Sequence, residues 1–362
     1  MKLLESTQLA NLSLKNKMVV AAMTRSRANK EGIVSDMTVT YYQQRASAGM
    51  ILTEAINISE DALGSPLTPG IFTQEQINAW KKVTDAVHQA GGKIIAQLWH
   101  TGRVGHSIDR NGKLPVSASA VAIEGAQHFT SQGMKDFETP KALTLEEIKQ
   151  TIQDYKQAAL NAIEAGFDGV ELHAANGYLP HQFLSDNVNL RTDEYGGNIE
   201  NKSRFIIEIM KTLIDTIGGD KVGIKISPLH SYGGVTFEDP IKSFNYLINE
   251  LNKLDFAFVE LMRRNPMFPA PAHYPTIDEI ELFGKDIKAT LIANSGYNRE
   301  TGESEIEKGI AKFISYGTLF LANPDLPKRF ELDAPLNAPD RATMFGGAAH
   351  GYIDYPFIDT DN

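Results

Sequence analysis

The chain has 362 residues, of which 42% are hydrophobic and 22% charged, a globular composition with ample material for a core. Its 35 Lys and Arg are outnumbered by 45 Asp and Glu, and the net charge of −10 argues against nucleic acid as a partner, because a phosphate backbone requires a basic surface. The absence of cysteine excludes disulfides, cysteine zinc sites, cysteine-ligated iron–sulfur clusters and thiol nucleophiles.

Short β-type runs alternate with amphipathic helical stretches along the whole chain. We expect strands over residues 17–23, 49–58, 93–99, 169–173, 222–227, 256–261, 290–295 and 312–316. Between them we expect helices over residues 35–48, 74–90, 144–165, 202–217, 237–254, 276–283 and 303–309. Eight strands separated by helices, mostly without hairpin signals, indicate parallel pairing through right-handed crossovers.

Two α/β architectures fit this order of elements, a closed (β/α)8 barrel (TIM barrel) and an open doubly wound sheet. A dinucleotide-binding open sheet carries G-x-G-x-x-G after its first strand, whereas this chain continues with Ala21-Ala22-Met23-Thr24-Arg25. The chain has no P-loop, G-x-S-x-G or H-E-x-x-H motif either, and no spacing that predicts a metal site. We therefore predict one (β/α)8 barrel domain over residues 1–362, with a long lid-like insertion over residues 102–143 after the third strand.

Polar residues gather where the predicted strands end, which is where a (β/α)8 barrel carries its active site. These ends hold Thr24, Glu54 and residues 97–100, 173–176, 225–227, 294–296 and 317–318. The turns after the last two strands contain Gly296 and Gly317 and suit a phosphate. A phosphate-bearing cofactor would then lie across the mouth of the barrel, with its ring over the first five strands.

The most informative segment follows the fourth predicted strand. His173 ends this strand, and Asn176 and Tyr178 follow on the turn, so that the three side chains can converge on one small ligand. Two donors on one oxygen with a phenol nearby can polarise a carbonyl and then deliver a proton. Taken singly, the three residues have plainer explanations as a strand-end histidine, a turn asparagine and a packed aromatic.

Four longer motifs occur in a characteristic order. They are Gln97-Leu98-Trp99-His100-Thr101-Gly102-Arg103, residues 173–179, Arg191-Thr192-Asp193-Glu194-Tyr195-Gly196-Gly197 and Ala322-Asn323-Pro324-Asp325-Leu326-Pro327. Together they resemble the old yellow enzyme family of FMN-dependent ene-reductases, and the likeness extends over residues 4–356. Within that family the chain is most similar to the bacterial group of N-ethylmaleimide reductase and pentaerythritol tetranitrate reductase.

The resemblance implies FMN as cofactor and specific roles for individual residues. The positions that match FMN contacts are Ala22, Met23, Thr24, Ala55, Gln97, Lys225, Ser295, Gly296, Gly317 and Thr318. His173 and Asn176 match the pair that binds the substrate's carbonyl or nitro oxygen, and Tyr178 matches the proton donor. Trp99 and Tyr352 resemble aromatic walls of the substrate cavity.

The resemblance also implies a reaction. NADPH or NADH would reduce the flavin, and flavin N5 would pass hydride to the activated C=C bond of an α,β-unsaturated carbonyl or nitro compound, such as an enone or a maleimide. The expected partners are small molecules, and the expected protein is a monomer or homodimer. Because no early apolar run approaches the ~20 residues of a membrane span and no secretory signal is evident, we expect a cytoplasmic location without membrane contact.

Three positions depart from the family pattern. Lys225 and Thr318 stand where the family usually has arginines, the second of which contacts the FMN phosphate, and Ser65 replaces a cavity tyrosine. Loss of a charge-assisted contact would weaken FMN binding by ~1.5–3 kcal/mol. Two alternative functions stay open for this reason: a barrel with weakened FMN binding that acts as a flavin- or ligand-binding protein, and a reductase specialised for nitrate esters or nitroaromatics.

Overall fold

Eight parallel strands close into a barrel in the computed structural model, which describes residues 1–268 and 270–358. In order around the barrel they are β3 (Met18–Val20), β4 (Met50–Asn57), β5 (Ile94–Trp99), β10 (Gly169–His173), β11 (Val222–Ile226), β12 (Phe258–Met262), β13 (Thr290–Asn294) and β14 (Phe313–Tyr316). Pairing of β14 with β3 closes the ring. Each strand overlaps a predicted one, and the predicted (β/α)8 barrel is confirmed.

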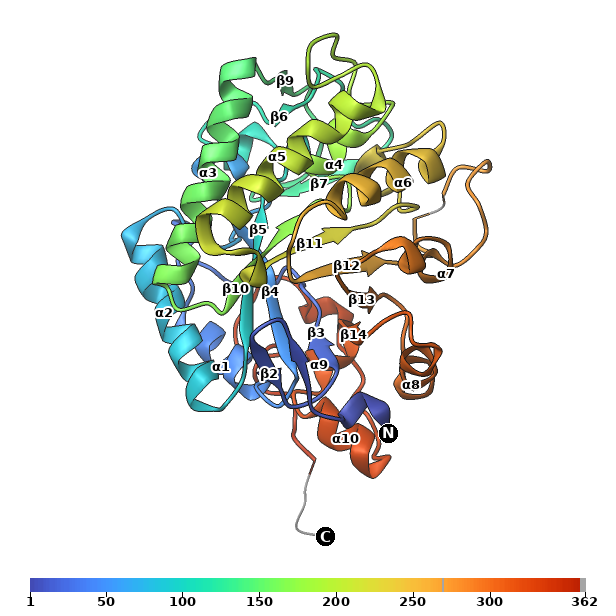
Figure 1. Cartoon of the computed structure of the whole chain (residues 1–362). Helices are drawn as coiled ribbons and strands as arrows, with labels where there is room; N and C mark the ends of the chain where they lie inside the picture. The colour runs from blue at the N-terminus through green and yellow to red at the C-terminus, as the bar shows by residue number, and fades with distance from the viewer. Residues whose placement is uncertain (269, 359–362) are drawn as a thin grey trace.

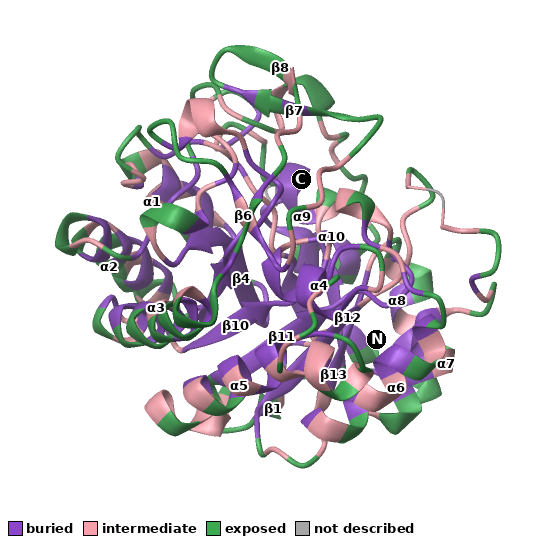
Figure 2. Cartoon of the chain, turned by 90° about the horizontal axis from the view of Figure 1, so that it is seen from above, coloured by how far each residue is buried: buried purple, intermediate pink, exposed green. Residues whose placement is uncertain are grey.

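The helices surround the barrel, as Figures 1 and 2 show. They are α1 (Asp36–Gln44), α2 (Gln74–Gln89), α3 (Leu145–Glu164), α5 (Ile199–Ile217), α6 (Pro240–Leu251), α7 (Glu279–Phe283) and α8 (Arg299–Lys308), and each overlaps a predicted helix. In α2 the buried residues Ile77, Trp80, Val83 and Val87 recur every three or four positions, which places them on one face against the strands. After β14 the chain forms α9 (Thr318–Ala322) and α10 (Leu326–Leu332), two short helices that the sequence did not predict.

A hairpin of β1 (Thr7–Leu9) and β2 (Leu12–Leu14) covers the end of the barrel where the strands begin. Leu9 and Leu14 are buried there in a cluster with Phe313 and other residues of the barrel interior. The hairpin was not predicted because strands of three residues carry too short an alternation to be recognised. It fills the amino end of the barrel interior with apolar side chains.

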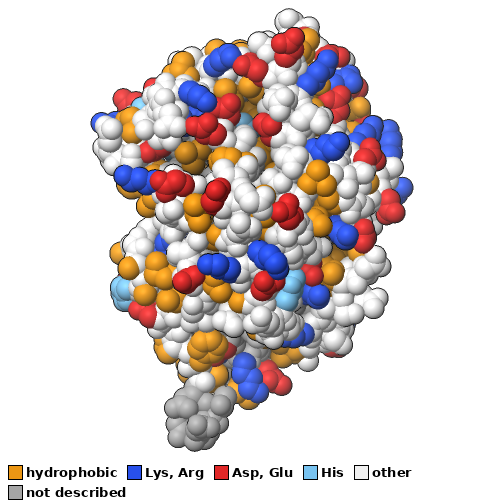
Figure 3. Space-filling view, turned by 90° about the vertical axis from the view of Figure 1, so that its left-hand side faces the viewer, with side chains coloured by type: hydrophobic (Ala, Val, Ile, Leu, Met, Phe, Trp, Pro, Cys, Tyr) orange, Lys and Arg blue, Asp and Glu red, His pale blue; other side chains and the backbone are white. Residues whose placement is uncertain are grey.

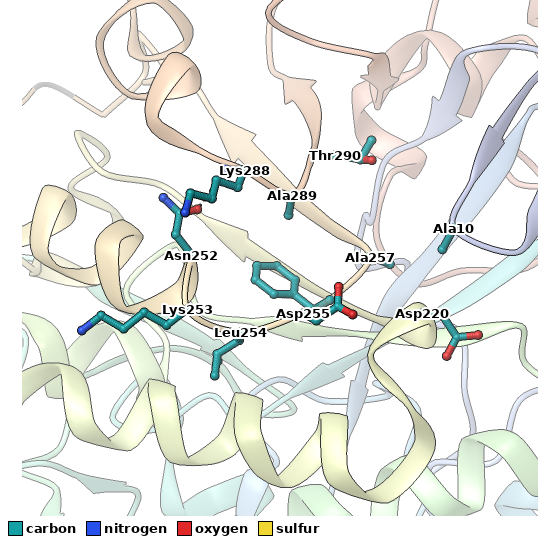
Figure 4. A pocket seen from close by; sticks show the side chains of 11 residues that line it. Ala10, Asp220, Asn252, Lys253, Leu254, Asp255, Ala257, Lys288, Ala289 and Thr290 are labelled. Atoms are coloured by element: carbon teal, nitrogen blue, oxygen red, sulfur yellow. Dashed lines mark hydrogen bonds between the residues drawn. The ribbon is translucent and has the colours of Figure 1, made fainter.

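Beside this hairpin lies an open groove of about 590 Å³. Figure 4 shows its lining, which includes Ala10, Asp220 and Thr290. Ala257 and Thr290 stand at the amino ends of β12 and β13, so the groove lies at the face that serves stability in barrel enzymes, away from the predicted site.

The predicted insertion after the third barrel strand is confirmed between β5 and α3. It contains β6 (Val116–Ser117), β7 (Gln127–Thr130), β8 (Gly133–Asp136) and β9 (Lys141–Ala142), with β6 paired to β9 and β7 to β8. Buried Arg103 donates to Val121 O at 3.0 Å and to Gly233 O at 2.8 Å, and thereby joins the insertion to the loop after β11. The insertion is thus attached at the carboxyl end of the barrel.

The exterior is polar and mixed in charge. On the face shown in Figure 3, acidic and basic side chains are interspersed without a large field of one sign. Within the part of the chain that the structure describes, no helix combines the length and the hydropathy required to cross a bilayer.

Candidate active site

His173 is the last residue of β10 and is buried at the carboxyl end of the barrel. Its Nδ1 accepts a hydrogen bond from the Ala175 N–H at 3.3 Å, which assigns the ring proton to Nε2. Burial, with a smaller contribution from the Lys225 charge, holds the pKa of His173 well below its usual value. The imidazole is therefore neutral at physiological pH and has an Nε2–H to donate to a ligand.

The turn after β10 brings Asn176 to the same place. Asn176 adopts a left-handed conformation with φ of 52°, which asparagine tolerates better than most residues, and its N–H donates to Ser227 Oγ at 2.9 Å. A Cβ on the next residue, Gly177, would stand 2.2 Å from Tyr232 O, so only glycine fits there. The buried Oδ1 of Asn176 has no hydrogen-bond partner among the described residues. This amide is thus positioned by its backbone and its Oδ1 is left without a protein donor.

Tyr178 precedes the short helix α4 (Leu179–Leu184) and packs against two other predicted site residues. Its ring lies edge-on to His173 at 4.8 Å and to Trp99 at 5.0 Å between centroids. Burial and the neighbouring Tyr232 raise the pKa of Tyr178 well above its usual value, so the phenol stays protonated throughout the physiological range. The structure therefore brings His173, Tyr178 and Trp99 into contact and places Asn176 on the turn between the first two.

Two groups of buried polar side chains lie in the barrel interior next to this turn. Gln97 Nε2 donates to Glu171 Oε2 at 2.6 Å, and Lys225 Nζ lies 2.8 Å from Glu260 Oε2. Glu260 also accepts from Ser315 Oγ at 2.6 Å. Strand register explains these partners, since Glu171 pairs with Gln97 and Glu260 with Lys225 on neighbouring strands. Glu171 and Glu260 thus lie on neighbouring parts of the interior, and Lys225 directly contacts Glu260.

The carboxyl group of Glu171 has an unusual pKa for a glutamate. Burial raises its pKa, the Glu260 charge adds to the effect and Lys225 opposes it, so that the pKa of Glu171 reaches about 8. Glu171 is therefore protonated at neutral pH. Sequence reasoning missed both carboxyl groups, although each stands in a Val-Glu-Leu triplet inside an otherwise apolar strand, and that was the available signal.

Replacing Glu171 with glutamine is expected to raise the thermal unfolding temperature at pH 8 by about 2–5 °C and to change it little at pH 5. The pKa of this carboxyl is about 8 in the folded protein, against ~4.3 in an unfolded chain. Its stabilising contribution is therefore complete below the unfolded value and is lost as the pH rises toward 8. Glutamine mimics the protonated form at every pH. Calorimetric melting curves between pH 5 and 8.5 test this, and an offset that does not vary with pH would contradict it.

The predicted cofactor contacts on the first two barrel strands lie near the same end. Ala22, Met23 and Thr24 follow β3 and are half-buried. Ala55 is buried in β4 and is paired with Gln97 on β5. A Cβ on Gly317 would stand 3.2 Å from Met23 Sδ, so the segment after β3 touches the turn after β14.

The two glycine-containing turns lie side by side, because Asn294 at the end of β13 pairs with Ser315 in β14. Ser295 has a φ of 84° and Gly296 a φ of 78°, so the chain bends sharply as it leaves β13. Gly317 precedes α9, and Thr318 is exposed as the first residue of that helix. All four predicted phosphate contacts therefore stand on one edge of the barrel mouth.

Tyr352 occupies a different environment from that of Trp99. It is fully buried, stacks on Tyr41 of α1 with ring centroids 4.4 Å apart and lies under the guanidinium of Arg27 at 4.4 Å. These contacts tie the C-terminal segment to α1 and to the segment after β3. Its expected place in the wall of the substrate cavity stays a prediction.

Comparison with known sequences decides which family this site belongs to. The profile described as "NADH:flavin oxidoreductase / NADH oxidase family" matches residues 2–337. The chain belongs to this family. It is 40% identical to putative 12-oxophytodienoate reductase 11 of Oryza sativa subsp. japonica over 99% of this chain and 98% of that relative. It is 41% identical to 12-oxophytodienoate reductase 1 of the same plant, over 99% and 93% of the two chains.

Solved structures place this flavin oxidoreductase among the old yellow enzymes. Morphinone reductase matches it with a TM-score of 0.93 at 40% identity over 99% of this chain and 96% of that chain. The old yellow enzyme homologue from Zymomonas mobilis matches with a TM-score of 0.94 at 37% identity, over 99% and 100%. The resemblance to the old yellow enzyme family is confirmed, and the narrower likeness to the bacterial N-ethylmaleimide reductase group is consistent with these matches. FMN and a nicotinamide dinucleotide are the cofactors of this family.

The residues of this flavin oxidoreductase fit FMN. Gln97 and Lys225 supply a buried amide and a buried cation at the carboxyl end of the barrel, where an isoalloxazine ring requires hydrogen-bond donors. The absence of side chains at Gly296 and Gly317 leaves room that a Cβ would fill, at the edge of the barrel where phosphates bind in this fold.

Proposed function

We propose that this flavin oxidoreductase reduces the activated C=C bonds of α,β-unsaturated carbonyl or nitro compounds, with NADPH or NADH as hydride donor. The observation that carries the proposal is the edge-on packing of Tyr178 against His173 and Trp99, with half-buried Asn176 on the same turn. Bound FMN would supply the hydride chemistry, taking hydride from the nicotinamide and passing it to the alkene. Several relatives are named as reductases of 12-oxophytodienoate or morphinone, which supports this substrate class.

His173 and Asn176 bind the substrate oxygen in this proposal. The neutral imidazole donates through Nε2–H, since its Nδ1 is an acceptor, and the asparagine donates through the N–H groups of its side-chain amide. Both donors become more effective as negative charge develops on that oxygen, because a buried site strengthens electrostatic interactions. Tyr178 then protonates the α-carbon, a role that its raised pKa permits because the phenol is fully protonated beforehand.

We also propose which residues contact FMN. Thr24, Gln97 and Lys225 would hold the ring, with backbone contacts from Ala22, Met23 and Ala55. Ser295, Gly296, Gly317 and Thr318 would hold the phosphate. We take residues 1–362 as a single domain around this site, of which residues 269 and 359–362 lie outside the described part.

The test is oxidation of NADPH and of NADH by FMN-saturated protein in the presence of 2-cyclohexenone, N-ethylmaleimide or glycerol trinitrate. We expect turnover of the enone and the maleimide at rates above that of the nitrate ester. Absence of enone and maleimide turnover in protein that retains FMN would overturn the proposal. Turnover of glycerol trinitrate alone would favour the nitrate-ester reductase.

One observation favours a second candidate, a barrel with weakened FMN binding that acts as a flavin- or ligand-binding protein. Thr318, where the family pattern has a phosphate-binding arginine, offers only an exposed hydroxyl. The visible spectrum of the protein after incubation with FMN and desalting separates the two candidates. A retained flavin spectrum with enone turnover supports the reductase, and colourless protein supports the second candidate.

A further inference from the structure

A further cation, Arg263, lies at the edge of the barrel where the two glycine-containing turns stand. Arg263 follows β12 directly, and its guanidinium donates to the Ser295 carbonyl oxygen through Nε at 2.9 Å and through Nη2 at 2.6 Å. The same guanidinium lies 4.0 Å from the ring centroid of buried Tyr297. Arg263 is thereby fixed against the turn after β13, with its side chain only 24% exposed.

The guanidinium lies directly beside Gly296 of the turn after β13. A Cβ on Gly296 would stand 3.2 Å from Nη2 of Arg263, so a side chain at this position would occupy the space beside the guanidinium. Gly296 has a φ of 78°, a conformation that L side chains rarely adopt. The glycine therefore keeps the approach to Arg263 open.

The hydrogen bonds of Arg263 leave donors for a ligand. A guanidinium has five N–H groups. Two donate to Ser295 O, and a third, on Nη1, donates to Asp278 Oδ2 at 3.1 Å. One N–H on Nη1 and one on Nη2 have no partner among the described residues, and two N–H groups on a planar guanidinium match two oxygens of a phosphate.

The ion pair with Asp278 still allows Arg263 to bind a second anion. Asp278 caps α7 by accepting from the Ile280 N–H at 2.9 Å, and its side chain is 32% exposed. A partly exposed pair of this kind is weak, so Arg263 can hold a dianionic phosphate while keeping its contact with Asp278.

We propose that Arg263 binds the phosphate of FMN and supplies the positive charge that position 318 lacks. The cation reaches the phosphate from β12, whereas the family pattern brings it from the turn after β14. This inference rests on FMN as the cofactor and not on the substrate class proposed above, so its failure would leave the ene-reductase proposal intact.

The test compares FMN with riboflavin, which has the same ring but no phosphate. Dissociation constants are obtained from flavin fluorescence on serial dilution of the holoenzyme and of protein loaded with riboflavin. Arg263→Ala is expected to weaken FMN binding by about 10- to 100-fold and to change riboflavin binding by less than about twofold. Equal weakening of both flavins would overturn the proposal, because it would show a loss of structure and not of a phosphate contact.

Arg264 provides the matched control. It is the adjacent arginine, and its Nε donates to Glu279 Oε1 at 3.1 Å while Nη2 donates to Ile277 O at 2.9 Å, away from Ser295. Arg264→Ala removes the same charge and is expected to leave the ratio of the two dissociation constants unchanged. An effect equal to that of Arg263→Ala would show a general electrostatic contribution and overturn the assignment.

A rescue experiment makes the result independent of the folding of one variant. Thr318→Arg added to Arg263→Ala is expected to recover most of the lost FMN affinity, since it restores a cation on the neighbouring turn. Arg263→Lys keeps the charge without the planar fork and is expected to bind FMN with intermediate affinity. If Arg263→Ala does not fold, Arg263→Lys with FMN and riboflavin decides the question, and an unchanged ratio would overturn the proposal.

Discussion

Tyr178→Phe is expected to slow the reduction of 2-cyclohexenone by about 10²- to 10⁴-fold, which is the contribution of a positioned general acid. Reduction of bound FMN by NADPH is expected to change by less than about threefold, because no proton from Tyr178 enters that half-reaction. Phenylalanine keeps the ring that packs edge-on to His173 and Trp99, so the variant removes the hydroxyl alone. Stopped-flow measurement of the two half-reactions separates these effects.

Tyr232 provides a comparison for this variant, because it is the neighbouring phenol that interacts with Tyr178 and adds to the effect of burial in raising its pKa. It is a second, half-buried phenol whose ring centroid lies 6.2 Å from that of Tyr178. Tyr232→Phe is expected to reduce the enone within about tenfold of the native rate. The proton-donor role of Tyr178 would be contradicted if Tyr178→Phe slowed both half-reactions equally, or if the two variants behaved alike.

Lys225→Met is expected to lower the free energy of unfolding by about 3–5 kcal/mol, the usual cost of removing one partner from a buried ion pair. Glu260 is fully buried, and its Oε2 contacts Lys225 Nζ at 2.8 Å. Without the lysine, the interior would hold two carboxyl groups and no cation in contact with them. Urea denaturation measured at pH 7 gives the change.

The double variant Lys225→Met/Glu260→Gln tests the cause. Glutamine keeps the bond from Ser315 Oγ to the side-chain oxygen but carries no charge. The double variant is therefore expected to regain most of the stability that Lys225→Met loses. If the effects of the two substitutions are simply additive, the lost stability comes from packing and not from the unpaired carboxylate.

The barrel strands could be predicted because each is an apolar run between helices with strong amphipathic patterns. The helix that begins at Leu145 illustrates this, since Thr144 and Glu147 stand three positions apart and form a capping box at its start. The hairpin of β1 and β2 could not be predicted, because Leu9 and Leu14 are buried only by contacts with the barrel interior, which comes from distant parts of the chain.

In the candidate site, the residues that belong to long sequence motifs were predicted. The residues whose role depends on partners from other strands were missed. His173, Asn176 and Tyr178 lie within six positions of one another, so local spacing was sufficient. Glu260 and Arg263 stand on β12 and in the residues after it, a region from which no motif was taken. Their partners Lys225 and Ser295 are contributed by other strands.

Patterns in the amino-acid sequence were sufficient to predict the alternation of strands and helices, and with it the barrel, the end at which the polar residues gather and the family. These follow from local periodicity and from motifs within short segments. The partners of the charged side chains depend on the three-dimensional fold: Lys225 contacts Glu260, Glu171 contacts Gln97, and Arg263 contacts the turn at Ser295. The physical reason is that strand register and barrel closure bring together residues far apart in the chain, and the energies of buried charges depend on those neighbours.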